Sequence, residues 1–277
     1  REATMELMDQ WEKTGLITYV GKVNMDRNGS DELCEKSAEE SAKDTQVWLD
    51  ELAKRSYART MPILTPRFIP SCSDELMQKL SEIQKEYKLR VQSHLSENLS
   101  EIAWVKELVP ESSCYGQAYE MFDMLGDETY PAIMAHCVYS GEEEMELLKS
   151  HHTYIAHCPD SNFNVASGIA PIRKYLEYGI SVGFGSDVAG GASLSILQSM
   201  AHAVEASKMY WRIKDQDVKP LTFDEVFYMA TLGGGSYFGK VGSFEKGYEC
   251  DLLVVDDSKI RSMRKLSVKE RAERMIY

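Results

Sequence analysis

Apolar runs and amphipathic stretches alternate along this chain from near its start almost to its end. Short runs rich in Val, Ile and Leu predict strands, and apolar residues that recur every three or four positions predict helices. The predicted strands are 16–25, 61–68, 89–94, 132–138, 153–158 and 180–184. The predicted helices are 39–57, 73–87, 97–108, 116–125, 141–151, 169–178, 194–213 and 223–231.

Local signals mark several helix ends. Ser73 stands where a hydroxyl caps the helix that follows. Ser140, with Glu143 three positions later, has the pattern of a capping box, and Gly179 follows a predicted helix as a C-terminal glycine does. These signals agree with the boundaries that the apolar pattern predicts.

Strands that alternate with helices imply a parallel sheet, either open and doubly wound or closed as a (β/α)₈ barrel. Arg67, His94, His136, His157 and Asp187 all fall at the C-terminal ends of predicted strands. The barrel is favoured because those ends converge on one mouth in a barrel. No GxGxxG follows the first strand, so a dinucleotide-binding sheet has no support.

The pattern predicts six strands, whereas a closed barrel has eight. Residues 240–256 combine Gly-rich turns with β-branched residues and predict a small antiparallel β unit, and 268–277 predict a charged helix. We therefore expect a partial barrel that carries the catalytic site in 1–239. We expect a truncated β-sandwich segment with a terminal helix in 240–277.

Composition narrows the function. The 277 residues are 43% hydrophobic, enough for one large core, and the formal charge of −13 argues against nucleic acid or an anionic membrane as partner. The apolar runs are too short for a bilayer, and the charged opening does not resemble a secretory leader. The 6 cysteines form no CxxC pair, which favours reduced thiols. These features suit a cytoplasmic enzyme that acts on a small neutral molecule.

Candidate chemistry begins with His94 and Glu97 in QSHLSEN. A neutral imidazole is a good zinc ligand, and a nearby carboxylate can move protons to and from activated water. Glu97 can instead be a first-turn helix charge. Asp187, which follows an apolar strand among glycines, can ligate a cation or simply form a turn. We favour the metal for His94 and Asp187, and general acid/base chemistry for Glu97.

His136 ends its strand in MAHC and has either a catalytic or a structural role. His157 and Asn162 lie in a turn-like stretch, and we expect His157 behind the site with no catalytic part. An Arg67 fork matches the O6/N7 edge of guanine, and Phe68 can pack on a planar ring. The alternatives are a rim salt bridge for Arg67 and core packing for Phe68.

The motifs QSHLSEN, MAHC, IAHCPDSN and GFGSDVAGG resemble strands five to eight of the amidohydrolase superfamily of metal-dependent deaminases. VGKVNMD resembles its third strand, and VGSFEKGYECDLLVVD resembles its returning β-sandwich segment. LTPRFIPSCSDELM is similar to the members that act on guanine. The resemblance implies a metal-dependent (β/α)₈ hydrolase barrel, of which this chain holds strands three to eight.

The resemblance further implies one zinc ion per subunit, in preference to iron, bound by His94, Asp187 and two histidines of an HxH motif on the first strand. It implies Glu97 as proton shuttle, His136 beside the attacking water and Asp187 as a base. Arg67 and Phe68 would hold the purine, with His94, Glu97 and Asp187 also around it. The implied reaction is hydrolysis of guanine to xanthine and ammonia by a cytosolic homodimer.

The chain departs from the superfamily in one respect: it contains no HxH, and strands one and two have no counterpart before Leu16. We therefore expect an internal piece of a longer enzyme. The alternatives are another superfamily enzyme that acts on a nitrogen heterocycle, or a catalytically incomplete purine-binding fragment. A cytidine-type zinc deaminase is disfavoured because its H-x-E and P-C-x-x-C signature is missing.

Overall fold

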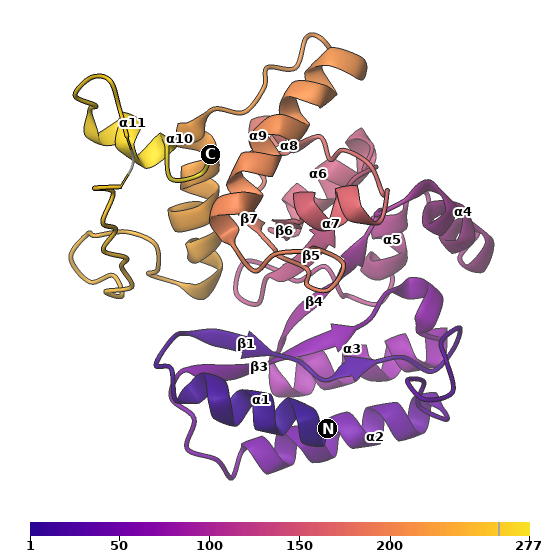
Figure 1. The fold of residues 1–277 in the computed structure, drawn as a ribbon. Helices are drawn as coiled ribbons and strands as arrows, with labels where there is room; N and C mark the ends of the chain where they lie inside the picture. Colours follow the sequence, from indigo (N-terminus) through magenta and orange to yellow (C-terminus); the bar gives the residue numbers. More distant parts are fainter. Residues whose placement is uncertain (260) are drawn as a thin grey trace. The chain divides into compact units, whose positions relative to one another are not determined.

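The computed structural model describes residues 1–259 and 261–277, which form two compact units (Figure 1). Unit 1 comprises Arg1–Ile155 and Tyr178–Ile180, and unit 2 comprises Ala156–Glu177 and Ser181–Tyr277. The first boundary falls inside strand β6 (Tyr154–His157). This division does not coincide with the expected boundary after residue 239, which stays a prediction.

The strands of unit 1 form a parallel sheet with the order β1-β3-β4-β5, and β2 also pairs with β3. In the β4–β5 register His94 lies opposite Ala135, and Leu95 lies opposite His136. The two histidines therefore lie one step apart at neighbouring strand ends. The strands are β1 (Thr18–Val20), β2 (Val23–Asn24), β3 (Thr60–Pro66), β4 (Arg90–Leu95) and β5 (Ala132–His136).

Helices pack on these strands: α1 contacts β1, α3 contacts β3, and α2 packs against α3 (Figure 1). The predicted stripe of α3 is confirmed, since Leu76, Leu80 and Ile83 are all buried. The helices of unit 1 are α1 (Glu2–Glu12), α2 (Ala38–Leu52), α3 (Asp74–Tyr87), α4 (Leu99–Leu108), α5 (Tyr115–Glu120) and α6 (Glu142–Ser150), with a 3₁₀ turn at Ile69–Ser71.

Two predicted helix caps have opposite outcomes. Ser73 caps α3 as predicted, because its side chain accepts a hydrogen bond from the Leu76 N–H. The capping box predicted at Ser140 is wrong: the N-cap of α6 is Gly141, which makes no side-chain cap bond. The carboxylate of Glu143 instead accepts a hydrogen bond from the Ser113 hydroxyl, so a tertiary contact replaces the local one.

Unit 2 contains strand β7 (Val182–Phe184), and the Gly185 N–H after it donates to the His157 carbonyl at 3.0 Å. Residues 159–162, whose composition is typical of a turn, lie instead in the short helix α7 (Pro159–Asn164), with proline in its first turn where no backbone donor is needed. None of the described helices combines the length and apolarity of a bilayer span. The other helices are α8 (Ile172–Tyr178), α9 (Ile196–Ile213), α10 (Phe223–Tyr228) and α11 (Val268–Glu273), with a π-helical turn at Met229–Gly233 and a 3₁₀ turn at Ser236–Phe238.

The tail contains the predicted terminal helix as α11, but no strand is assigned to the described residues between 240 and 256. The apolar residues of this segment are exposed, with 85% of Leu253 and 92% of Val254 open to solvent. A β-branched run becomes a strand only when it pairs with another strand. The assignment of this segment to a β-sandwich therefore stays a prediction.

An ion pair joins α8 to α10. The Arg173 guanidinium donates to both carboxylate oxygens of Glu225 and to the Lys219 and Pro220 carbonyls. Burial alone would raise the pKa of Glu225, but hydrogen bonds from Arg173 and Thr222 outweigh it and lower the pKa from 4.5 to about 2. Because the folded pKa is depressed, the pair stabilises the fold above pH 4.5 and loses this effect as the pH falls towards about 2.

Arg173→Met should therefore lower the free energy of unfolding at pH 7 by about 1–2 kcal/mol, a value discounted for partial exposure of the pair. Urea unfolding of wild type and variant at several pH values between 7 and 2 measures this difference. The difference should shrink as Glu225 becomes protonated. A difference that stays constant down to pH 2 would show that the lost packing of the arginine stem, and not the ion pair, causes the effect.

Candidate active site

His94 is held at the end of β4 by a backbone carbonyl. Its Nδ1 lies 2.7 Å from the Arg67 carbonyl oxygen. A carbonyl only accepts hydrogen bonds, so Nδ1 carries the hydrogen and Nε2 of the neutral ring carries a lone pair. This arrangement is typical of histidines that bind a metal through Nε2.

His136, the last residue of β5, lies beside His94. The two ring centroids are 5.4 Å apart and the rings are inclined by 21°. His136 is 1% exposed, and its φ of 74° places it in the left-handed region, as does the φ of 47° for Cys137. The Cys137 N–H donates to the Leu95 carbonyl at 2.9 Å and joins the ends of β4 and β5. Residues in this region are strained, and such strain is common at functional sites.

Glu97 follows β4 after another left-handed residue, Ser96, whose φ is 47°. Its Oε2 lies 3.8 Å from Nε2 of His136, and its side chain is 19% exposed. This separation is too long for a direct hydrogen bond between the two atoms. The structure thus brings His94, His136 and Glu97 together within unit 1, as the barrel-mouth hypothesis requires.

Arg67 and Phe68 follow β3 and lie next to this group. The Arg67 guanidinium carbon lies 5.4 Å from the Phe68 ring centroid, a cation–π geometry, and the Phe68 ring lies 6.4 Å from that of His94. The Arg67 N–H donates to the Asn24 carbonyl at 3.0 Å, which fixes the backbone. Arg67 is exposed, and in the part of the chain that the structure describes its guanidinium forms no ion pair. The rim salt bridge considered for it is therefore absent there.

Glu101 is a carboxylate of this region that the sequence reasoning missed. It is the third residue of α4, where Asn98 caps its N–H, and it is 7% exposed. Burial raises the pKa of Glu101; the Tyr115 hydroxyl opposes this effect and the charge of Glu97 adds to it. The sequence offered only a glutamate at a position typical of helix N-termini, which gave no reason to expect burial.

Asp187 follows β7 in unit 2. Its Oδ2 accepts a hydrogen bond of 2.5 Å from the Ser161 hydroxyl, and its φ is 47°. A Cβ at Gly190 would lie 2.7 Å from Ser161 Oγ and 2.8 Å from Asp187 Oδ2. The absence of a side chain at Gly190 thus makes room for this serine–aspartate pair.

The loop after Asp187 is fixed by Asp160, which the sequence reasoning also missed. Its Oδ2 accepts hydrogen bonds from the N–H groups of Ala192 and Ser193 at 2.7 and 3.2 Å. Its Oδ1 lies 3.3 Å from Nδ1 of His202. His157 and Asn162 are buried in the same unit, and the His157 ring lies 6.0 Å from Phe184.

The donor types suit zinc. An imidazole whose Nδ1 is held by a backbone carbonyl, as in His94, and a carboxylate oriented by a hydroxyl, as in Asp187, are both common zinc ligands. No group of three or more His, Cys, Asp or Glu side chains among the described residues is arranged to hold a metal ion. His94 belongs to unit 1 and Asp187 to unit 2.

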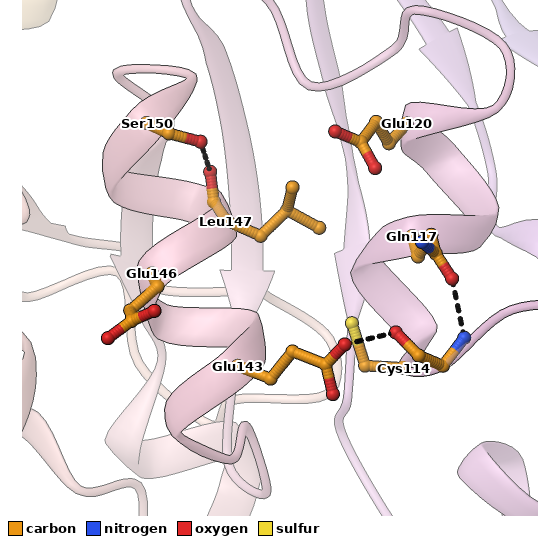
Figure 2. A pocket seen from close by; sticks show the side chains of 8 residues that line it. Cys114, Gln117, Glu120, Glu143, Glu146, Leu147 and Ser150 are labelled. Carbon is orange, nitrogen blue, oxygen red and sulfur yellow. Dashed lines mark hydrogen bonds between the residues drawn. The ribbon is translucent and has the colours of Figure 1, made fainter.

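A groove of about 400 Å³ lies between α5 and α6 of unit 1 (Figure 2). Figure 2 shows Glu143 and Gln117 directed at the loop before α5, where the Ser113 N–H donates to Gln117 Oε1 at 2.6 Å. None of the predicted site residues lines the groove, so it is distinct from the group around His94. Its lining residues are Ser113, Cys114, Gln117, Glu120, Glu143, Glu146, Leu147 and Ser150.

The class of this protein follows from a comparison with known families. Residues 1–275 match the amidohydrolase family, so the chain belongs to that family. Members of this family are metal-dependent. The superfamily resemblance noted from the strand-end motifs is confirmed.

Its relatives include guanine deaminases. The guanine deaminase of Dictyostelium discoideum is 40% identical over 258 residues, which are 92% of this chain and 56% of the relative. The guanine deaminase of Homo sapiens is 38% identical with the same coverage. The chain thus spans about half the length of the curated relatives it matches.

A crystal structure of guanine deaminase from C. acetobutylicum with bound guanine is 46% identical, with a TM-score of 0.93 over 100% of this chain and 65% of that one. The E. coli guanine deaminase structure has a TM-score of 0.86 and 30% identity, over 98% of this chain and 62% of that one. A structure of atrazine chlorohydrolase from Arthrobacter aurescens complexed with zinc, at 22% identity and a TM-score of 0.72, shares the fold. The predicted partial (β/α)₈ barrel is confirmed by these similarities.

Proposed function

We propose that the protein containing this chain hydrolyses guanine to xanthine and ammonia. The observation that carries this proposal is the placement of Arg67 and Phe68 beside the imidazoles of His94 and His136, with Glu97 3.8 Å from His136. The guanine deaminases among its relatives, at 38–40% identity, support the same reaction.

We propose one zinc ion per subunit, held by Nε2 of His94, the Asp187 carboxylate and two histidines of an HxH motif outside this chain. When bound, zinc acts as a Lewis acid and makes water a nucleophile near neutral pH. Neighbouring residues orient the two proposed metal ligands of this chain. The Arg67 carbonyl fixes the His94 tautomer, and the Ser161 hydroxyl orients Asp187.

Recognition of the purine falls to Arg67 and Phe68. The guanidinium fork presents parallel donors that match the O6 and N7 acceptors of guanine. Adenine presents an amino donor in place of O6, so the same fork disfavours it. The Phe68 ring, already against Arg67, offers an apolar face on which a planar base can pack.

Proton transfer falls to Glu97, Asp187 and His136. The oxygen of the attacking water bonds to C2 of guanine while Asp187 accepts a proton from that water. Glu97, which starts protonated, gives its proton to N3. The C2 hydroxyl then gives its proton to the Glu97 carboxylate, which passes it to the amine. The C2–N2 bond breaks, ammonia leaves as the C2 carbonyl forms, and the proton held by Asp187 returns to Glu97. His136 stabilises the charge that develops at C2.

The full-length protein, supplied with zinc, is expected to convert guanine to xanthine and ammonia and to leave adenine and cytosine unchanged. Separate incubations with the three bases, followed by chromatography of the products, test this. The sequence upstream of Arg1 should encode an HxH on an apolar strand. No xanthine from zinc-loaded protein would contradict the proposal. Turnover of another nitrogen heterocycle would indicate a different amidohydrolase, and binding of guanine without turnover would indicate a purine-binding protein.

We further propose a cytoplasmic homodimer, as the resemblance to the guanine-acting members of the superfamily implies. Light scattering on the purified protein measures the oligomeric state directly. A monomer at all concentrations would contradict the dimer.

A further inference from the structure

Two buried hydroxyls lie directly behind His94 and Arg67. Ser93 in β4 is 6% exposed, and Tyr119 in α5 is fully buried. Their oxygens are 2.8 Å apart. Ser93 Oγ also lies 2.7 Å from the Pro66 carbonyl and 3.0 Å from the Arg67 carbonyl, and the Tyr119 oxygen lies 2.8 Å from the His94 carbonyl.

The two hydroxyl protons cannot serve all these contacts at once, because each hydroxyl donates a single hydrogen. If Ser93 donates to Tyr119 and Tyr119 to the His94 carbonyl, Ser93 Oγ faces the Pro66 and Arg67 oxygens with no hydrogen between them. If Ser93 instead shares its hydrogen between those two carbonyls, the Tyr119 hydroxyl donates either to Ser93 Oγ or to the His94 carbonyl, and one oxygen–oxygen contact is left without a hydrogen. The arrangement in which Ser93 donates to the carbonyls is favoured, because it leaves one contact without a hydrogen instead of two.

In this arrangement the Arg67 carbonyl, which has two lone pairs, accepts hydrogen bonds from both Ser93 Oγ and His94 Nδ1. Resting on the proposed function, we propose that Ser93 and Tyr119 are positioning residues that hold this carbonyl in place and so aim Nε2 of His94 at the metal. Neither hydroxyl touches the substrate.

The test uses the full-length protein with Ser93→Ala or Tyr119→Phe. Zinc affinity, measured by competition with a chromogenic chelator, should fall about 10- to 100-fold in each, as for other groups that orient a metal ligand. Ser93→Thr keeps a hydroxyl on a strand residue and should restore the affinity. Thr153→Val is the matched control, because it removes another buried hydroxyl of unit 1 that donates to a carbonyl, that of Leu125 at 2.8 Å. This control should leave zinc affinity unchanged.

Unchanged zinc affinity in both variants, or an equal fall in Thr153→Val, would overturn the inference. Guanine turnover is measured in parallel. A wild type that holds zinc but forms no xanthine refutes the proposed reaction alone, because the zinc comparison still stands. A wild type that forms xanthine while both variants keep normal zinc affinity refutes the positioning role alone. A wild type that binds no zinc refutes the metal site and this inference with it.

Discussion

Replacing Glu97 with glutamine is expected to lower kcat for guanine about 100- to 10,000-fold, the range usual for loss of a general acid/base. The amide keeps the shape of the carboxylate but cannot carry the proton to N3 and then to the leaving amine. Glu97 is not among the residues proposed to bind zinc, so metal content should stay at the wild-type level. Steady-state kinetics together with metal analysis measure both quantities.

A second substitution, in the helix that follows Glu97, separates the role of the Glu97 carboxylate from the general effect of a Glu→Gln change. Glu107→Gln lies further along α4 and changes the same functional group away from the His94 group, so kcat should stay near the wild-type value. Glu97→Gln with normal kcat would remove Glu97 from the proton-transfer role. Loss of zinc in Glu97→Gln would instead indicate that the Glu97 carboxylate is a zinc ligand.

Replacing Arg67 with alanine should raise KM for guanine about 5- to 150-fold, which corresponds to the roughly 1–3 kcal/mol of a bidentate contact to a base edge. The guanidinium is exposed and stacks on Phe68, so its removal should change the fold little. The backbone carbonyl that holds His94 is retained in the variant. Zinc affinity should therefore change much less than KM.

Arg67→Lys is the informative companion, because lysine keeps the charge and loses the planar fork. It should recover only part of the affinity for guanine. Full recovery of the affinity for guanine would show that the positive charge alone matters and that the guanidinium makes no bidentate contact with O6 and N7. An unchanged KM in Arg67→Ala would place the purine elsewhere.

Much of the candidate site was predictable because it depends on local pattern and strand order. His94 and His136 each end an apolar strand, and consecutive parallel strands of a barrel lie side by side. Their proximity therefore follows from the order of the strands in the sequence. The stripe of α3 was predictable for a similar reason, since helical period and burial coincide there.

The supporting groups were not predictable, because distant parts of the chain supply them. Tyr119 is 26 residues from its partner Ser93, and Ser161 is 26 residues from Asp187. Glu101 and Glu143 have the sequence context of ordinary helix-cap residues, yet the structure turns one into the interior and the other towards Ser113. Local propensity carries no information on such packing.

The Arg67 carbonyl bonded to His94 has a thermodynamic consequence. If zinc and guanine bind as proposed, Arg67 contacts the metal ligand His94 through its main-chain carbonyl and the purine through its side chain. Any effect of the metal on purine affinity must then be reciprocal: the factor by which zinc tightens guanine is the factor by which guanine tightens zinc. Substrate would in that case protect the enzyme from chelators.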